Sequence, residues 1–408
     1  MSGTVAAQAI NFSLSFLLAR LYEPYDFGHY SIVIGVAAVL AAASTFALDR
    51  VIILARTAVQ ARKVASAVLL INLCFSMLIL FVGVILTISG IDRYLPLNAL
   101  DLIVFIPLFM LFYGGSQVFI YSSLRNQRVS NIAVLKVAQS SAMGVAQIAL
   151  SFLRLAGGLV VGNIVGWMLP FAAGLRWRIR EGFIQRDMTS RSLLSVVQRH
   201  WRYPRYIMPN EAIDNLSNQA PIFLIGMFVS LSSAGYYGLA ILMLSAPAAV
   251  LGQAVGQAFF QFIGRSDGDF ALLRRAVFHI WIALAILGFL PFLLIGTWGA
   301  ELFAFAFGRN WADAGRVAAM LSPLLFVRFV SSPTSTIYLK LEMQREQWWF
   351  CVAGAVYRVT AYGFMAVGAS LDAAIMVHVV LEIIAICAYN LLALRRLSIN
   401  HSSREHAG

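Results

Sequence analysis

The chain has 408 residues, of which 60% are hydrophobic and only 12% are charged, and its mean hydropathy is +0.80. A soluble domain of this length does not need so much apolar surface, so the composition excludes a water-soluble enzyme. The formal net charge of +12 would fit a nucleic-acid partner, but the basic residues are distributed between apolar segments in a pattern that indicates a membrane instead.

Twelve apolar segments run through the chain, and about 20 apolar residues suffice to cross a bilayer core of roughly 30 Å as a helix. We predict spans at 2–20, 31–49, 64–90, 100–122, 130–152, 155–175, 204–229, 234–260, 276–298, 314–338, 346–368 and 371–393. The first span has no basic leader, and more spans follow it, so it is not a cleaved signal peptide. From its abrupt start at Met1 we expect that a short basic leader precedes it. Because the alternating pattern of a membrane β-barrel is absent, the sequence predicts an all-α polytopic membrane protein with twelve transmembrane helices.

Basic residues are concentrated in every second connection between the spans. Twenty-three of the 30 Lys and Arg residues follow even-numbered spans or the last one. The positive-inside rule therefore predicts that both termini are cytoplasmic, with the basic surface facing anionic lipid headgroups.

The longest polar connection, about 176–203, divides the spans into six and six. We predict an N-lobe at 1–178, a cytoplasmic basic linker at 179–203, a C-lobe at 204–395 and a cytoplasmic tail at 396–408. Within the linker, the apolar residues Leu193, Leu194, Val197 and Trp201 favour a short amphipathic helix on the membrane surface. A solvated linker is the alternative.

The two halves resemble each other at an offset of 207 residues. The matching pairs are Gln8 with Asn215, Asn11 with Asn218, Gly28 with Gly235, and Tyr30 with Tyr237. Each half begins with a helix that carries several polar residues. We expect a tight turn that contains the Gly and the Tyr to follow this helix. Because each half has an even number of spans, the repeat is parallel, and such repeats usually enclose a central cavity.

Residues 17–56 read LLARLYEPYDFGHYSIVIGVAAVLAAASTFALDRVIILAR. This stretch resembles the first junction of the polysaccharide-flippase (Wzx-type) family, which belongs to the multidrug/oligosaccharidyl-lipid/polysaccharide exporter superfamily. Residues 234–261 read AGYYGLAILMLSAPAAVLGQAVGQAFFQ and resemble the matching element of the second lobe. The Pro that often follows this element is replaced by Gln261.

The resemblance implies a MATE-like, V-shaped transporter fold with two six-helix lobes, located in the bacterial inner membrane. It implies a flippase that moves undecaprenyl-pyrophosphate-linked oligosaccharide, an O-antigen or exopolysaccharide repeat unit, to the periplasmic leaflet. The implied partners are this lipid-linked oligosaccharide, inner-membrane lipids, and the polymerase and chain-length proteins of a glycan export system. We expect no cofactor, no bound metal and no nucleic-acid partner for this protein.

Charged side chains inside the spans are costly and therefore mark functional sites. Arg328 and Arg358 lie within spans 10 and 11, and a guanidinium group can hold a pyrophosphate by bidentate hydrogen bonds. The alternative is a structural pair with Glu382 or a backbone carbonyl. Arg20 and Arg50, at the ends of the first two spans, are further headgroup candidates, and anchoring at the membrane interface is their alternative.

Polar side chains recur on single faces of three spans. In spans 1 and 7 we assign them to a cavity that binds the glycan, and the residues are Gln8, Asn11, Asn210, Asp214, Asn215 and Asn218. Such stripes also join helices to each other by hydrogen bonds, which is the alternative. For Gln253, Gln257 and Gln261 in span 8 the sequence does not decide between these two roles.

Glu382 and His378 lie four residues apart and share a face of span 12, where they could couple transport to a proton. Asp214 and Glu211 are competing candidates, and a satisfied hydrogen bond within the membrane is the alternative. The ATP-binding pattern GxxxxGK[ST] does not occur, so an ion gradient or the membrane potential would drive transport.

Two other functions stay open. A cation-coupled multidrug exporter of the same fold would need an acidic or aromatic cavity, and the arginines at depth argue against it. An integral-membrane glycan polymerase or acyltransferase would need clustered catalytic side chains, and the sequence shows no such cluster. We therefore expect a transporter rather than an enzyme.

Overall fold

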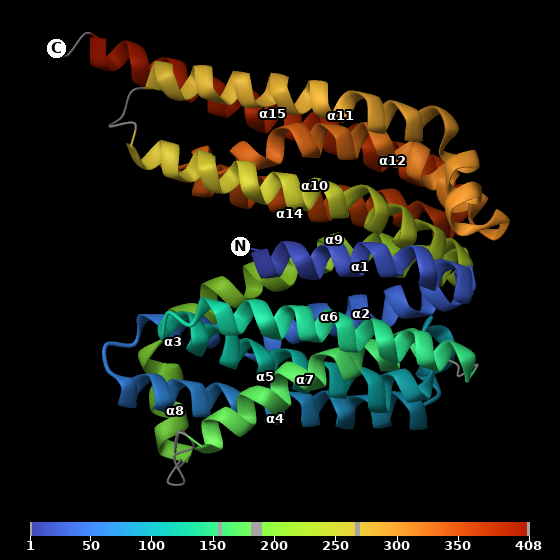
Figure 1. The fold of residues 1–408 in the computed structure, drawn as a ribbon, viewed down its shortest axis with the longest axis vertical. Helices are drawn as coiled ribbons and strands as arrows, with labels where there is room; N and C mark the ends of the chain where they lie inside the picture. The colour runs from blue at the N-terminus through green and yellow to red at the C-terminus, as the bar shows by residue number, and fades with distance from the viewer. Residues whose placement is uncertain (1, 154–156, 181–189, 266–269, 406–408) are drawn as a thin grey trace. The chain divides into compact units, whose positions relative to one another are not determined.

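The computed structural model describes residues 2–153, 157–180, 190–265 and 270–405, and every regular element within these ranges is a helix (Figure 1). The long helices of the first half are α1 (Ser2–Leu21), α2 (Pro24–Ser44), α4 (Ala58–Ile88), α5 (Ile106–Arg125), α6 (Val129–Phe152) and α7 (Gly158–Arg180). Those of the second half are α9 (Met208–Phe228), α10 (Leu231–Arg265), α11 (Phe270–Phe307), α12 (Ala312–Ser331), α14 (Gln344–Gly363) and α15 (Leu371–Glu405). The short α-helices are α3 (Val51–Leu54), α8 (Ser190–Arg199) and α13 (Ile337–Lys340).

Ten helices in the described part of the chain are long and apolar enough to cross a membrane. The other two long helices are α1, whose apolar part is Val5–Leu21, and α9, whose first half is polar. The prediction of an all-α polytopic membrane protein is therefore confirmed. The order of the twelve long helices matches the twelve predicted spans, but α1 and α9 fall short of the other ten in apolar length or composition.

The second span begins and ends earlier than predicted, because local backbone geometry sets its limits. Pro24 starts α2, and the side chains of Glu23 and Asp26 form a reciprocal capping box at its N-terminus. Phe46 and Ala47 have φ values of 50° and 56°, which end the helical run. The prediction of a span at 31–49 was therefore wrong at both ends, since α2 covers Pro24–Ser44.

The predicted span 314–338 is interrupted near its C-terminal end. Helix α12 stops at Ser331, and a 3₁₀ turn (Ser332–Thr334) and the short α13 complete the segment. The local sequence SSPTST explains the break, because Pro333 cannot donate a backbone hydrogen bond and Ser and Thr side chains compete for the backbone. Thr334 donates its hydroxyl to the carbonyl of Ser331 at 2.9 Å.

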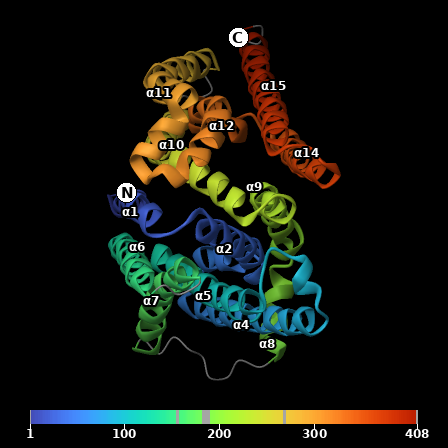
Figure 2. The ribbon, with the colours of Figure 1, turned by 90° about the vertical axis from the view of Figure 1, so that its right-hand side faces the viewer.

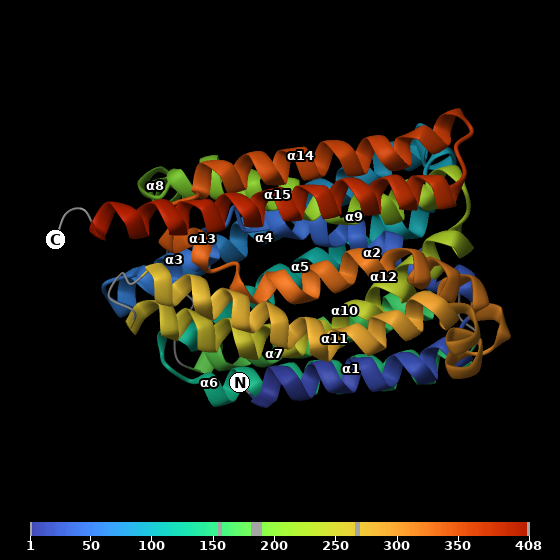
Figure 3. The same cartoon turned by 90° about the horizontal axis from the view of Figure 1, so that it is seen from above.

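The contacts divide the chain into two compact units, residues 1–235 and 236–408. In the first unit, α2 packs on α5 and α9, α4 packs on α5, and α6 packs on α1 and α7 (Figures 1 and 2). In the second unit, α12 packs on α11 and α15, and α14 packs on α15 (Figure 3). The predicted lobe boundaries at residues 178 and 204 stay predictions, and α9 packs within the first unit.

Helix α8 forms where the sequence predicted a short amphipathic helix. Val196 and Val197 pack against a buried cluster of the first unit that includes Leu48, Ile52 and Val68. Its neighbour α4 lies beside it (Figure 2). These contacts exclude a fully solvated linker at 195–199, whereas the side chains of Leu193 and Leu194 lie outside the described residues.

Gly28 and Gly235, a pair matched across the proposed repeat, meet at a close contact between α2 and the start of α10. A Cβ on Gly28 would lie 1.7 Å from the carbonyl oxygen of Leu231, and one on Gly235 would lie 2.0 Å from that of Pro24. Pro24 and Leu231 are themselves 207 residues apart, so the contact is reciprocal under the repeat offset. Both glycines lie inside helices, so the expected turn containing Gly and Tyr was wrong.

Candidate functional site

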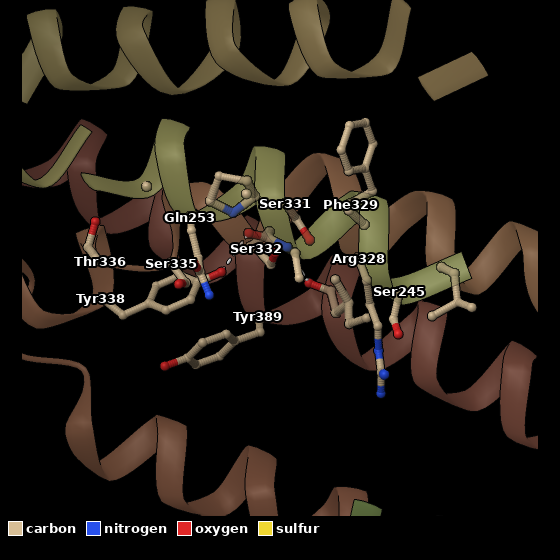
Figure 4. Close-up of a pocket in the computed structure, with 18 of the residues that line it drawn as sticks. Ser245, Gln253, Arg328, Phe329, Ser331, Ser332, Ser335, Thr336, Tyr338 and Tyr389 are labelled. Atoms are coloured by element: carbon tan, nitrogen blue, oxygen red, sulfur yellow. Dashed lines mark hydrogen bonds between the residues drawn. The ribbon is translucent and has the colours of Figure 1, made fainter. Parts of the chain in front are cut away.

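The second unit contains a cavity of about 1190 Å³, lined by α10, α12, α14, α15 and the break after α12 (Figure 4). Its charged lining residues in the described part of the chain are Arg328, Arg358 and Glu382. Both arginines were predicted from their position inside spans, and the structure brings them together in one site. The cavity exceeds the roughly 300–1,000 Å³ of typical small-molecule pockets, so it can hold a larger ligand.

Glu382 is the centre of a buried ion cluster. The guanidinium group of Arg358 donates from Nε to Oε2 at 3.0 Å and from Nη2 to Oε1 at 2.8 Å, which is a bidentate pair. Arg328 also donates from Nη2 to Oε1. The Glu382 side chain is only 2% exposed, whereas that of Arg328 is 35% exposed and lies in the cavity.

His378 joins this cluster from the same face of α15. Its Nε2 lies 2.7 Å from Oε2 of Glu382, and its Nδ1 lies 3.0 Å from the hydroxyl of Tyr362. A neutral imidazole that donates from Nε2 and accepts at Nδ1 satisfies both contacts. The predicted proximity of His378 and Glu382 is present, and their role in ion coupling stays a prediction.

The formal charges at this site do not balance. Among the described residues that line the cavity, two guanidinium groups share one carboxylate, so their formal charges sum to +1 when His378 is neutral. Glu382 lies within the apolar stretch Leu371–Ile399, where isolated charge is costly. The alternative predicted from the sequence, a structural pair with Glu382, is thus correct for the contact.

A neutral polar surface lines the rest of the cavity. It includes the glutamine stripe that the sequence left undecided, namely Gln253, Gln257 and Gln261 of α10. The Ser and Thr residues of the break after α12 line it too, and Figure 4 shows Ser331, Ser332, Ser335 and Thr336 facing this space. The structure therefore places the stripe on a cavity.

Aromatic residues of α13, α14 and α15 line one side of the neutral surface. Tyr338 donates its hydroxyl to Oδ1 of Asn390 at 2.6 Å, and the rings of Tyr338 and Tyr389 lie 4.4 Å apart. Phe350 stacks on Tyr389 with centroids 5.1 Å apart. These residues were not predicted from the sequence, where their only signal was a place near the predicted cytoplasmic ends of spans 10 to 12.

Arg50 and Arg20 lie in the first unit and belong to a different environment. Arg50 pairs with Glu211 of α9, and the hydroxyl of Tyr121 also contacts its guanidinium group. Arg20 lies in the last turn of α1, and the 21 residues of α2, about 32 Å, separate its position from that of Arg50. The structure therefore does not bring these two arginines together.

The polar stripe of α9 is divided between two faces. Asn210, Asp214 and Asn218 have exposed side chains and follow each other at intervals of four. Gln219, by contrast, packs against α2, since a Cβ on Gly35 would lie 3.0 Å from its Oε1. Asn215 donates to the backbone oxygen of Glu211 at 2.8 Å, so its amide serves the helix itself. The exposed residues Asn210, Asp214 and Asn218 therefore fit a water-filled cavity better than Asn215 and Gln219 do.

In α1, the side-chain oxygens of Gln8 and Asn11 are buried without a hydrogen-bond partner among the described residues. Helix α1 packs on α6. A buried acceptor that lacks a donor is unusual and indicates a missing partner. The assignment of Gln8 and Asn11 to glycan binding stays a prediction.

Comparison with known proteins supports the fold and the family. The model of a family described as "Polysaccharide biosynthesis protein" matches residues 17–316. No curated protein matches the sequence.

Solved structures of membrane transporters match nearly the whole chain. The lipid II flippase MurJ in an inward closed conformation matches with a TM-score of 0.70 and 13% identity, over 98% of this chain and 89% of that chain. An inward-facing multidrug resistance MATE family transporter of the MOP superfamily matches with a TM-score of 0.61 and 14% identity, over 98% and 96%.

A MOP superfamily transporter from Pyrococcus furiosus, whose binding pocket is described as having reverse polarity, matches with a TM-score of 0.55. It is 13% identical and covers 98% of this chain and 95% of that chain. At these identities the likeness concerns the fold, and the expected MATE-like transporter fold is confirmed.

Proposed function

Because this chain belongs to the polysaccharide biosynthesis protein family, we propose that it flips a lipid-linked oligosaccharide across the bacterial inner membrane. The cargo is an undecaprenyl-pyrophosphate-linked O-antigen or exopolysaccharide repeat unit. It moves by alternating access while the lipid tail stays in the bilayer. One protein that shares this fold is described as a lipid II flippase, which supports a lipid-linked cargo.

The observation that carries the proposal is the excess positive charge held within an apolar helix bundle. Burying two guanidinium groups with one carboxylate costs free energy unless a further anion visits the site. A diphosphate supplies that anion, and arginine binds its oxygens in bidentate geometry. The partly exposed Arg328 is the group that meets the headgroup first, and Arg358 holds Glu382 in place behind it.

The remaining sites have supporting roles in this proposal. Arg20 and Arg50 contact the headgroup near the two membrane surfaces. The ion pair of Arg50 with Glu211 competes with this contact. The glycan meets the polar faces of α1 and α9. Glu382, His378 and Asp214 are the candidates for ion coupling, since the hydrogen bonds of His378 link a proton acceptor directly to the arginine cluster.

The alternative function, a cation-coupled multidrug exporter, fits the cavity less well. A cationic drug would meet two arginines there and only one carboxylate. A glycan polymerase or acyltransferase would have to place its reacting groups around the same cluster, where Glu382 is already bound by both arginines.

Complementation of a strain that lacks this gene tests the function. Wild-type protein restores surface glycan, whereas Arg328→Ala leaves lipid-linked repeat units facing the cytoplasm. Arg358→Lys, which keeps the charge but loses the bidentate pair, restores export in part.

The alternatives predict other outcomes in the same strain. Loss of a polymerase leaves single repeat units on the cell surface, and loss of a drug exporter changes only drug tolerance. Either of these results would overturn the flippase proposal. Reporter fusions check that each variant is inserted in the membrane.

A further inference from the structure

Charged and neutral lining residues occupy opposite ends of the cavity. Helices α14 and α15 pack together and are joined by a short connection, so they run antiparallel. Arg358 pairs with Glu382 across them. Gln347 lies eleven residues before Arg358, and Asn390 lies eight residues after Glu382, so both lie at about 12–16 Å from the ion cluster in the same direction.

The other two lining helices follow the same order. Tyr338, ten residues after Arg328, hydrogen-bonds to Asn390 and thus marks the neutral end. A Cβ on Gly256 of α10 would lie 3.3 Å from the carbonyl oxygen of Pro333, which places Gln257 and Gln261 beyond the break. Figure 4 shows this separation, with Arg328 and Ser245 toward one end and Thr336 and Tyr338 toward the other.

The neutral end carries the chemistry that binds sugar hydroxyls. The amides of the three glutamines each offer donors and an acceptor, and their side chains are exposed in the cavity. The hydroxyl oxygen of Thr336 is buried and has no hydrogen-bond partner among the described residues. The ring faces of Tyr338 and Tyr389 add an apolar surface for the C–H face of a sugar.

The neutral end also lacks the charge that an acidic sugar would need. Among the described residues, no Lys or Arg lines this end. The basic residues that line the cavity are Arg328 and Arg358, at the other end. A uronic acid placed there would lose hydration without gaining a counter-ion, which disfavours binding.

We propose that Gln253, Gln257 and Gln261 form a subsite for uncharged sugars that follow the first sugar of a repeat unit whose diphosphate is held by Arg328. This inference rests on the proposed function and narrows its substrate class. The protein thus selects repeat units whose second and later sugars are neutral hexoses or N-acetylhexosamines, and it discriminates against units with a uronic acid at these positions.

Binding to the purified full-length protein tests this subsite with three synthetic probes. Each probe has the same short polyprenyl diphosphate, which carries no sugar, a neutral disaccharide, or the same disaccharide with a uronic acid as its second sugar. We expect the neutral disaccharide to bind about tenfold more tightly than the other two, as one or two added hydrogen bonds allow.

Two variants separate the subsite from a structural role. Gln257→Leu/Gln261→Leu should bind the neutral disaccharide only as tightly as the sugar-free probe, and its thermal unfolding is measured alongside. Gln198→Leu, on the exposed face of α8, is the matched control and should bind like the wild type. Gln257→Lys supplies the missing cation and should raise affinity for the uronic acid probe about tenfold.

The outcomes distinguish this inference from the proposed function. Equal affinity for all three probes, still dependent on Arg328, would overturn the subsite and leave the headgroup site standing. Binding of the sugar-free probe that Arg328→Ala does not change would overturn the headgroup site itself. Tighter binding of the uronic acid probe by the wild type would contradict the charge argument.

Discussion

Arg328 of α12 and Arg358 of α14 both donate to Oε1 of Glu382. Loss of either arginine therefore leaves the other one paired with Glu382, and loss of Glu382 removes the carboxylate that both arginines share. This asymmetry makes the site testable, because single arginine variants remove the excess charge without leaving a buried carboxylate alone. It also explains how two like charges are held together at membrane depth.

Glu382→Gln should increase affinity for the diphosphate headgroup and slow its release. The substitution raises the formal excess from one to two positive charges, and a charge-assisted hydrogen bond contributes about 1.5–3 kcal/mol. Headgroup affinity and single-turnover transport are measured on the same preparation. Weaker headgroup binding by Glu382→Gln would show that the carboxylate positions the arginines rather than balancing them.

The same variant checks ion coupling. If Glu382 and His378 carry the coupled proton, transport by the wild type depends on an imposed pH gradient and transport by Glu382→Gln does not. Asp214→Asn, in the other unit, is the matched comparison. A pH response that survives in Glu382→Gln and disappears in Asp214→Asn would move the coupling role to Asp214.

Reversing the ion pair of the first unit tests whether Arg50 acts through Glu211 or on the headgroup. Arg50→Glu and Glu211→Arg should each lower thermal stability and export, because each places like charges together. The double variant Arg50→Glu/Glu211→Arg should recover both if the pair is structural. Recovered stability without recovered export would assign Arg50 a direct part in transport.

The reciprocal glycine contact should tolerate no side chain. Gly28→Ala and Gly235→Ala each place a Cβ within 2.0 Å of a backbone oxygen, so α2 and α10 must separate. We expect each to lower the free energy of unfolding by about 1–3 kcal/mol and to reduce export. Gly264→Ala, on the same helix α10 but in open space, is the control and should leave both unchanged. Equal tolerance at all three positions would contradict the close approach.

The charge distribution predicts an orientation in the membrane that topology reporters can check. Fusions after Arg186 and at the C-terminus should report the cytoplasm, and a fusion in the connection at 89–99 should report the periplasm. Replacing basic residues of the central linker should weaken this orientation. A cytoplasmic signal after Arg186 together with a periplasmic signal from the C-terminus would require an odd number of spans between the two fusions.

Much of this architecture is readable from the sequence, because hydrocarbon imposes strict rules on length and charge. The apolar runs predict the long helices, and Arg328 and Arg358 stand out as the arginines inside spans. The ends of α2 were missed because the apolar run does not coincide with the capping box at Glu23 or the left-handed residues Phe46 and Ala47. Such local geometry overrides hydropathy.

The site was harder to predict, since tertiary packing decides what a polar stripe faces. The glutamines of α10 have the same spacing whether they join helices or line a cavity, and only the break after Ser331 opens space beside them. The contact of Tyr338 with Asn390 links residues 52 positions apart and has no sequence signal. The charge balance at Glu382 likewise required knowing that both arginines reach one carboxylate.

Transport in reconstituted vesicles tests the headgroup clamp most directly. The measurement is the flip rate of a fluorescent polyprenyl-diphosphate disaccharide, with wild-type protein, Arg328→Ala and the control Arg396→Ala, whose arginine pairs with Glu346 instead. We predict that Arg328→Ala folds normally and flips the lipid at least about tenfold more slowly than the wild type, whereas Arg396→Ala flips it at the wild-type rate. Wild-type flipping by Arg328→Ala would show that no phosphate depends on this cation, and the proposed mechanism would be wrong.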